Sequence, residues 1–224
     1  MQFKAIAVDV DGTITFGDRR LDCRAVGALR SLSLPVVIAT GNILCFARAA
    51  AKLLGTCSTL IAENGGVVEC EKVEYDTSHM KECEEAFEFL KDHFELERLD
   101  SEYRMTEICL RRDFDVQEAG RSLAGFPKVM IVDTGFAIHI LSRSINKGRG
   151  LIKVAKMMGL EAKDFVAIGD SPNDIEMIKA SGFGIAVGNA HPDLKKAADM
   201  VTEGEYGAGV EEAVGELKRR GEIR

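Results

Sequence analysis

The stretch KAIAVDVDGTIT (residues 4–15) joins an apolar run to two carboxylates that stand one residue apart, Asp9 and Asp11. A short, continuous apolar run is typical of a strand that is buried on both faces. Aspartate is depleted in strands, and neighbouring carboxylates repel each other. The stretch therefore predicts a buried strand whose carboxyl end is either solvated or faces a positive charge.

Similar apolar runs alternate with helical spacing through the first part of the chain. After a strand at 3–8, the pattern predicts helices at 22–32 and 43–54 and strands at 35–40 and 58–63. Apolar strands separated by helices are typical of a parallel sheet that is covered on both faces. The sequence therefore predicts an α/β fold.

The pattern changes after residue 66 and returns at Asn146. Between them we expect a hairpin at 67–76, helices at 81–94 and 115–125, a strand at 105–111 and two strands within 128–141. Beyond them we expect helices at 147–158, 173–180, 191–198 and 208–219 and strands at 165–170 and 183–187. We therefore predict a Rossmann-like parallel-sheet core domain (1–79 and 146–224) with an inserted α+β cap domain (80–145).

Composition and charge exclude several classes of protein. The chain has 224 residues, 46% of them hydrophobic, and a net charge of −7, so neither nucleic acid nor an anionic membrane is an expected partner. Six scattered cysteines without a C-x-x-C pair form neither a zinc motif nor a compact disulfide framework. No signal peptide or membrane span is evident, so we expect a cytoplasmic protein with reduced thiols.

Polar residues follow several of the expected parallel strands. The carboxyl ends of such strands share one edge of the sheet, where ligands of open α/β folds bind. The side chains expected at this edge are Asp9, Asp11, Thr40, Asp170, Asn173 and Asp174. Four aspartates together are repulsive, and a divalent cation with oxygen ligands removes the repulsion, which indicates Mg²⁺.

Each of these motifs also has a purely structural interpretation. Asp and Asn after a strand are common in turns and helix caps, and SPND (171–174) is a reasonable helix start. Lys147 opens an expected helix after the cap, where it could lie in solvent or reach a phosphate. The spacing of DVDGTI differs from a calcium loop, and the chain contains no P-loop or dinucleotide fingerprint.

Taken together, four motifs resemble those of the haloacid dehalogenase superfamily of phosphohydrolases. D-x-D-G-T matches residues 9–13, a Thr after an apolar strand matches Thr40, a Lys at a helix start matches Lys147, and G-D-x-x-N-D matches residues 169–174. An insert between the second and third motifs, and ENGG (63–66), look like the Cof-like branch. The TGN sequence at 40–42 and the short cap look most like archaeal phosphoglycolate phosphatases.

The resemblance implies a role for each motif residue. Asp9 is implied as the nucleophile that forms an aspartyl-phosphate. Asp11 is implied as the general acid and base, and its backbone carbonyl as a metal ligand. The implied Mg²⁺ site also contains the Asp9, Asp170 and Asp174 carboxylates. Lys147 is implied as a catalytic and phosphate-binding residue, and Thr40 and Asn173 as phosphate-binding residues.

The resemblance thus implies an Mg²⁺-dependent phosphatase acting on a small phosphorylated metabolite, with 2-phosphoglycolate as the best guess. A sugar-phosphate phosphatase or phosphomutase of the same superfamily is an alternative, and a non-catalytic cation- or phosphate-binding protein is another. A substrate carboxylate calls for a cation or oriented amides in the cap. Arg104, Arg111 and Arg112 are available there, and the sequence assigns none of them.

Overall fold

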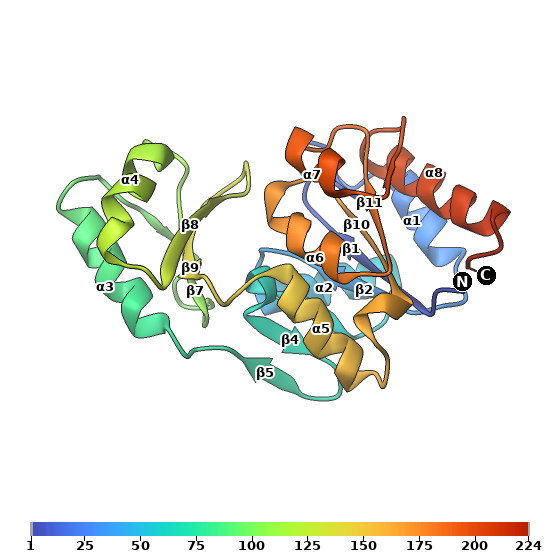
Figure 1. Ribbon diagram of the computed structural model, residues 1–224, viewed down its shortest axis with the longest axis horizontal. Helices are drawn as coiled ribbons and strands as arrows, with labels where there is room; N and C mark the ends of the chain where they lie inside the picture. Colours follow the sequence, from blue (N-terminus) through green and yellow to red (C-terminus); the bar gives the residue numbers. More distant parts are fainter. Residues whose placement is uncertain (1, 224) are drawn as a thin grey trace.

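The computed structural model describes residues 2–223, and its larger sheet, here called the core sheet, has eight strands (Figure 1). Their order is β12-β11-β10-β1-β2-β3-β4-β5, parallel from β12 to β3 and antiparallel beyond it. The strands are β1 (Ala5–Asp9), β2 (Val36–Ala39), β3 (Leu60–Ala62), β4 (Val67–Glu69), β5 (Val73–Tyr75), β10 (Phe165–Gly169), β11 (Phe183–Ala186) and β12 (Met200–Val201).

Helices cover both faces of the core sheet (Figure 1). α1 packs against α2 and α8, whereas α5 packs against α6. The helices are α1 (Cys23–Arg30), α2 (Leu44–Leu54), α5 (Lys147–Met157), α6 (Ile175–Ala180), α7 (Pro192–Ala197) and α8 (Tyr206–Arg219). Every residue of β1, β2 and β10 is buried, which explains the uninterrupted apolar runs. The predicted fold class is confirmed.

The smaller sheet, here called the cap sheet, is antiparallel in the order β6-β7-β9-β8. Its strands are β6 (Arg98–Leu99), β7 (Glu107–Leu110), β8 (Val129–Asp133) and β9 (Ile138–Ser142). The helices α3 (Met80–Lys91) and α4 (Val116–Ser122) lie on its side away from the core sheet (Figure 1). No helix between residues 2 and 223 has the length and apolar character that crossing a membrane requires.

Side-chain alternation gives the cap sheet two different faces. Ile108 and Leu110 of β7, with Ile138 and Ile140 of β9, belong to the apolar cluster formed with α3 and α4. Because successive strand residues point to opposite faces, Glu107 and His139 lie on the face turned away from those helices. The face of the cap sheet that carries Glu107 and His139 is therefore the one available to the core.

The division of the chain into domains remains our proposal. Support comes from the buried apolar residues, which form one cluster around the core sheet and a second, drawn from residues 80–140, around the cap sheet. We propose a core domain of 1–79 and 146–224 and a cap domain of 80–145. Residues 1 and 224 lie outside the described part of the chain.

Candidate active site

The order of the core strands creates a natural binding crevice. The chain runs from β1 outward through β2 and β3, and later returns to the other side of β1 as β10. Ligands of open α/β sheets bind at the carboxyl ends of the strands where the direction of winding reverses, here β1 and β10. Asp9 is the last residue of β1, and Asp170 directly follows β10.

A third carboxylate, from Asp174, lies beside these two. One carboxylate oxygen from each of Asp9, Asp170 and Asp174 lies within 4.8 Å of the other two. Asp174 ends the short 3₁₀ helix η4 (Pro172–Asp174), and its Oδ2 accepts the backbone N–H groups of Asp170 and Ser171 at 3.1 Å each. Asp174 therefore caps the turn, as the SPND sequence suggested, and also contributes a carboxylate to the acidic cluster.

Lys147 supplies positive charge to this cluster. It is the first residue of α5, and its Nζ lies 2.5 Å from Asp9 Oδ1 and 2.6 Å from Asp174 Oδ1. The side chain is fully buried. Burial alone would lower the pKa of Lys147, but Asp174 and Asp9 raise it above its usual value, so the group stays an ammonium.

One ammonium does not neutralise three carboxylates. Burial raises the pKa of Asp9 well above its usual value against the opposing effect of Lys147, and burial together with Asp174 raises the pKa of Asp170 to about 7. If all three carboxylates are ionised, their three negative charges against one ammonium leave an excess of two, which a bound divalent cation would compensate. Closely spaced carboxylate oxygens with this excess fit a divalent cation such as Mg²⁺.

The loop after β1 closes tightly over Asp170. Gly12 has φ +87°, and a Cβ atom on it would lie 2.4 Å from Asp170 Oδ2, so only glycine fits here. The next residue, Thr13, donates its hydroxyl to Asp170 Oδ1 at 3.0 Å. Gly12 and Thr13 of the D-x-D-G-T stretch thus help to position Asp170 within the cluster.

Asp11 lies apart from the acidic cluster, beside the loop that follows β2. Asn42 Nδ2 donates to Asp11 Oδ2 at 2.6 Å. The buried Thr40 hydroxyl accepts the backbone N–H of Asn42 at 3.0 Å and its Nδ2 at 3.1 Å. The TGN sequence therefore orients the second carboxylate of the opening stretch.

A chain of polar groups, buried at Asn64, Glu107 and His139, runs from the partly buried Asn173 to the cap sheet. Asn173 Nδ2 donates to Asn64 Oδ1 at 2.9 Å, and Asn64 Nδ2 donates to Glu107 Oε2 at 2.9 Å. The other oxygen of Glu107 lies 2.9 Å from Nδ1 of His139. Asn173, which directly precedes Asp174 in the chain, is therefore connected through Asn64 with Glu107 and His139 of the cap sheet.

Arg104 joins this chain, and the other two cap arginines do not. Arg104 pairs with Glu107 and donates through Nη1 to the carbonyl of Gly41 at 2.9 Å. Burial alone would raise the pKa of Glu107, but His139 and Arg104 hold it below its usual value. Arg111 and Arg112 form exposed ion pairs at 2.8 Å with Glu97 and Asp133.

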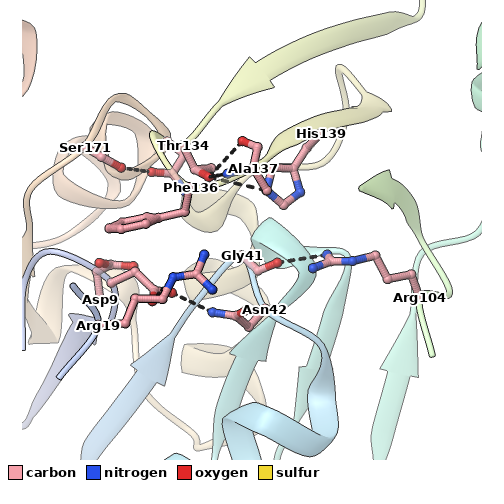
Figure 2. Close-up of a pocket in the computed structure, with 12 residues that line it drawn as sticks. Asp9, Arg19, Gly41, Asn42, Arg104, Thr134, Phe136, Ala137, His139 and Ser171 are labelled. Atoms are coloured by element: carbon pink, nitrogen blue, oxygen red, sulfur yellow. Dashed lines mark hydrogen bonds and ion pairs between the residues drawn. The ribbon is translucent and has the colours of Figure 1, made fainter. Parts of the chain in front are cut away.

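A small pocket of about 40 Å³ opens between the core and the cap. Asp9, Arg19 and Asn42 lie on its core side, opposite Thr134, Phe136 and His139 of the cap (Figure 2). The other residues that line it are Asp11, Gly41, Arg104, Ala137, Ser171 and Asn173.

Sequence reasoning missed several residues of this pocket. Arg19 and Phe136 lie on loops without a motif, and their pairing depends on how the cap docks. His139 and Glu107 offered a weak signal, because each is a polar residue in an otherwise apolar strand pattern. The predicted residues, by contrast, all lie around the ends of β1, β2 and β10 or at the start of α5.

The sequence model of the haloacid dehalogenase-like hydrolases matches residues 6–107 and 111–214. The match covers most of the chain and includes all four motifs. The chain belongs to the haloacid dehalogenase-like hydrolase family. The superfamily predicted from the motifs is thereby confirmed.

Individual relatives of this haloacid dehalogenase-like hydrolase are similar along its whole length. A phosphoglycolate phosphatase of Methanosarcina acetivorans is 54% identical over 229 residues, covering 100% of both chains. The crystal structure of a Thermoplasma acidophilum protein matches with a TM-score of 0.86 at 23% identity, covering 97% of this chain and 99% of that one. The predicted likeness to archaeal phosphoglycolate phosphatases is confirmed.

A second solved structure, from an enzyme of the haloacid dehalogenase superfamily, also shares the fold. It belongs to a sugar phosphatase of subclass IIB and matches with a TM-score of 0.72 at 21% identity, covering 98% of this chain and 100% of that one. At such identities the two structures support the fold of this haloacid dehalogenase-like hydrolase, core and cap together, and leave its substrate open.

Proposed function

We propose that this protein is an Mg²⁺-dependent phosphatase that hydrolyses a small phosphomonoester, and that 2-phosphoglycolate is its substrate. The observation that carries the proposal is the cluster of Asp9, Asp170, Asp174 and Lys147, from which Asp9, together with Asp11, lines the pocket beneath the cap. The relative named phosphoglycolate phosphatase, 54% identical over its full length, supports the choice of substrate.

In the first step a carboxylate oxygen of Asp9 attacks phosphorus. A bond from that oxygen to phosphorus forms while the bond from phosphorus to the ester oxygen breaks. Asp11 gives a proton to the departing alkoxide, which leaves as glycolate. The product on the enzyme is an aspartyl-phosphate.

In the second step water attacks the same phosphorus. Asp11, now ionised, takes a proton from the water, and the bond between phosphorus and the Asp9 oxygen breaks. Inorganic phosphate leaves and both aspartates return to their starting states. Because Asn42 holds one oxygen of Asp11 at 2.6 Å, the other oxygen is available for these proton transfers.

The remaining residues stabilise charge and position groups. Asp9, Asp170, Asp174 and the backbone carbonyl of Asp11 would hold Mg²⁺, which when bound reduces the repulsion between a carboxylate nucleophile and a phosphate dianion. The Lys147 ammonium and the Thr40 hydroxyl would bind phosphoryl oxygens. Through its bond to Asn64, Asn173 orients the loop that carries Asp170 and Asp174.

The test is phosphate release from 2-phosphoglycolate by the purified protein with Mg²⁺, after EDTA treatment, and after Mg²⁺ is restored. We expect turnover that stops with EDTA and returns with Mg²⁺. The variant Asp9→Asn should lose it, whereas Asp92→Asn, which removes an exposed carboxylate, should not.

Three other outcomes contradict the proposal in different ways. A higher kcat/KM for glucose 6-phosphate or ribose 5-phosphate than for 2-phosphoglycolate would identify a sugar phosphatase. Isomerised product without free phosphate would identify a phosphomutase. Binding of phosphate and Mg²⁺ with no turnover of any phosphomonoester would identify a binding protein.

A further inference from the structure

The cationic groups of the pocket differ in what they are free to bind. Two guanidinium groups, Arg19 and Arg104, line it among the described residues. Arg104 is nearly buried, is paired with Glu107 and donates to the carbonyl of Gly41. Its charge is already balanced within the protein.

Arg19, by contrast, forms no close ion pair or side-chain hydrogen bond with another described residue. Its side chain is 53% exposed, and its nearest carboxylate is that of Asp11, whose Oδ1 lies 3.8 Å from Arg19 Nε, beyond hydrogen-bond distance. Within residues 2–223 its guanidinium donates no hydrogen bond to a protein acceptor. A planar fork of N–H donors thus faces the pocket with its hydrogen-bonding capacity unused.

A turn holds the backbone of Arg19, and an aromatic ring contacts its guanidinium. Arg19 belongs to a tight turn in which its N–H donates to Phe16 O and the Phe16 N–H donates to Arg20 O, both at 2.9 Å. The guanidinium carbon lies 4.8 Å from the centre of the Phe136 ring, on the cap loop between β8 and β9. Figure 2 shows the Phe136 ring on the cap side of the pocket and Arg19 on its core side.

The backbone conformation of Arg19 is a second indication that its side chain has a functional role. Its φ is +67°, a left-handed conformation that glycine adopts without strain and arginine does not. Strained backbone persists at positions where the surrounding structure requires it and is concentrated at functional sites. Here the strain places a cation next to the proposed acid.

We propose that Arg19 is the specificity-determining residue that binds the carboxylate of the leaving group. The inference rests on the proposed function and adds to it. Asp11 must approach the ester oxygen to within about 2.6–3.2 Å to protonate it. In 2-phosphoglycolate one methylene carbon separates that oxygen from the carboxylate, so a cation 3.8 Å from Asp11 lies where the carboxylate must be. Guanidinium and carboxylate then pair with two parallel hydrogen bonds.

The test compares 2-phosphoglycolate with ethyl phosphate, in which a methyl group replaces the carboxylate. Charge-assisted hydrogen bonds imply that Arg19→Met lowers kcat/KM for 2-phosphoglycolate by about 10- to 100-fold and changes that for ethyl phosphate by less than about threefold. Arg19→Lys, which keeps the charge, should recover part of the loss. The control is Arg20→Met, whose exposed side chain pairs with Asp18 in the same turn and should leave both values unchanged.

The other outcomes separate this inference from the proposed function. An equal loss on both substrates would show that Arg19 acts through Asp11, and no loss on either would show that it binds no substrate group. Each overturns the inference while the proposed function stands. Wild-type protein that does not prefer 2-phosphoglycolate to ethyl phosphate would instead overturn the proposed substrate, and the inference with it. A melting curve for each variant confirms that it is folded.

Discussion

Lys147 is an ammonium without contact with solvent, held between Asp9 and Asp174. Removing one partner of a buried ion pair leaves the other charge uncompensated, at a cost of about 3–5 kcal/mol. We therefore expect Lys147→Met to lower the free energy of unfolding by about that amount, measured by urea denaturation in EDTA. Lys153→Met, on the exposed side of the same helix, should cost less than about 0.5 kcal/mol. Equal losses in the two variants would contradict this account.

Asn42 holds the carboxyl group of Asp11 through a single short hydrogen bond. Without it the carboxyl group can rotate away from the ester oxygen, and misplacement of about 1 Å can cost up to about 100-fold in rate. We expect Asn42→Ala to lower kcat for 2-phosphoglycolate by about tenfold with little change in KM, measured by steady-state phosphate release. A change confined to KM would mean that Asn42 binds the substrate instead.

At the scale of elements, the start of α5 depends on how closely the segment after β3 approaches it. Gly65 has φ +99°, and a Cβ atom on it would lie 2.3 Å from the carbonyl oxygen of Asn146. Gly65→Ala should therefore displace the helix start that carries Lys147. We expect a loss of about 2 kcal/mol or more in the free energy of unfolding, together with a lower kcat.

The matched control for Gly65→Ala is Gly120→Ala in α4. Gly120 is exposed within a helix, and a Cβ atom there meets nothing within 4 Å. Because alanine is the better helix former, this variant should gain about 0.5–1 kcal/mol. If the urea midpoint falls for both variants, or for neither, the close approach at Gly65 does not determine the stability of the helix start.

The sequence patterns predict strands correctly where a strand is long and buried. β1, β2 and β10 were predictable because both of their faces are covered. The two-residue strands β6 and β12 carry no periodicity and were not predicted. The helix expected at 173–180 begins as the 3₁₀ turn η4, because Asp174 caps that turn with its side chain and α6 starts only at Ile175.

The same distinction holds for the site. The motif residues could be placed from sequence because the carboxyl ends of parallel strands meet at one edge. Arg19 and Phe136 could not, since they become neighbours only when the cap loop lies over the β1 loop. Chain order carries no information about that docking.

For the molecule as a whole, cation binding should be coupled to folding. The carboxylates of Asp9, Asp170 and Asp174 converge only in the folded chain, so Mg²⁺ should raise the melting temperature. At about 100 times its dissociation constant the gain is about 2.7 kcal/mol, which is roughly 5–10 °C for a chain of this size. Differential scanning fluorimetry with Mg²⁺ and with EDTA measures it. Asp170→Asn should reduce the shift, and an undiminished shift would place the cation elsewhere.

The docking of cap on core should respond to acid through Glu107. This carboxylate links Arg104 and His139 of the cap with Asn64 of the core, and its pKa in the folded protein lies below the usual value. Its ionised form therefore favours folding. That stability is present above the unfolded pKa of about 4.3 and is lost as the pH falls through the lower folded pKa.

We therefore expect Glu107→Gln to be less stable than wild type at about pH 7, by about 3–5 kcal/mol, because Arg104 is left buried without its carboxylate. The difference should shrink as the pH falls below about 4.3 and through the lower folded pKa of Glu107, where wild type loses the same charge. Glu97→Gln breaks the exposed pair with Arg111 and should differ little from wild type at any pH. Urea denaturation across this pH range measures both differences in unfolding free energy. The other carboxylates titrate alike in all three proteins, so their contributions to these differences cancel. A difference for Glu107→Gln that does not shrink before wild type unfolds in acid would show that its charge does not couple the cap to the core.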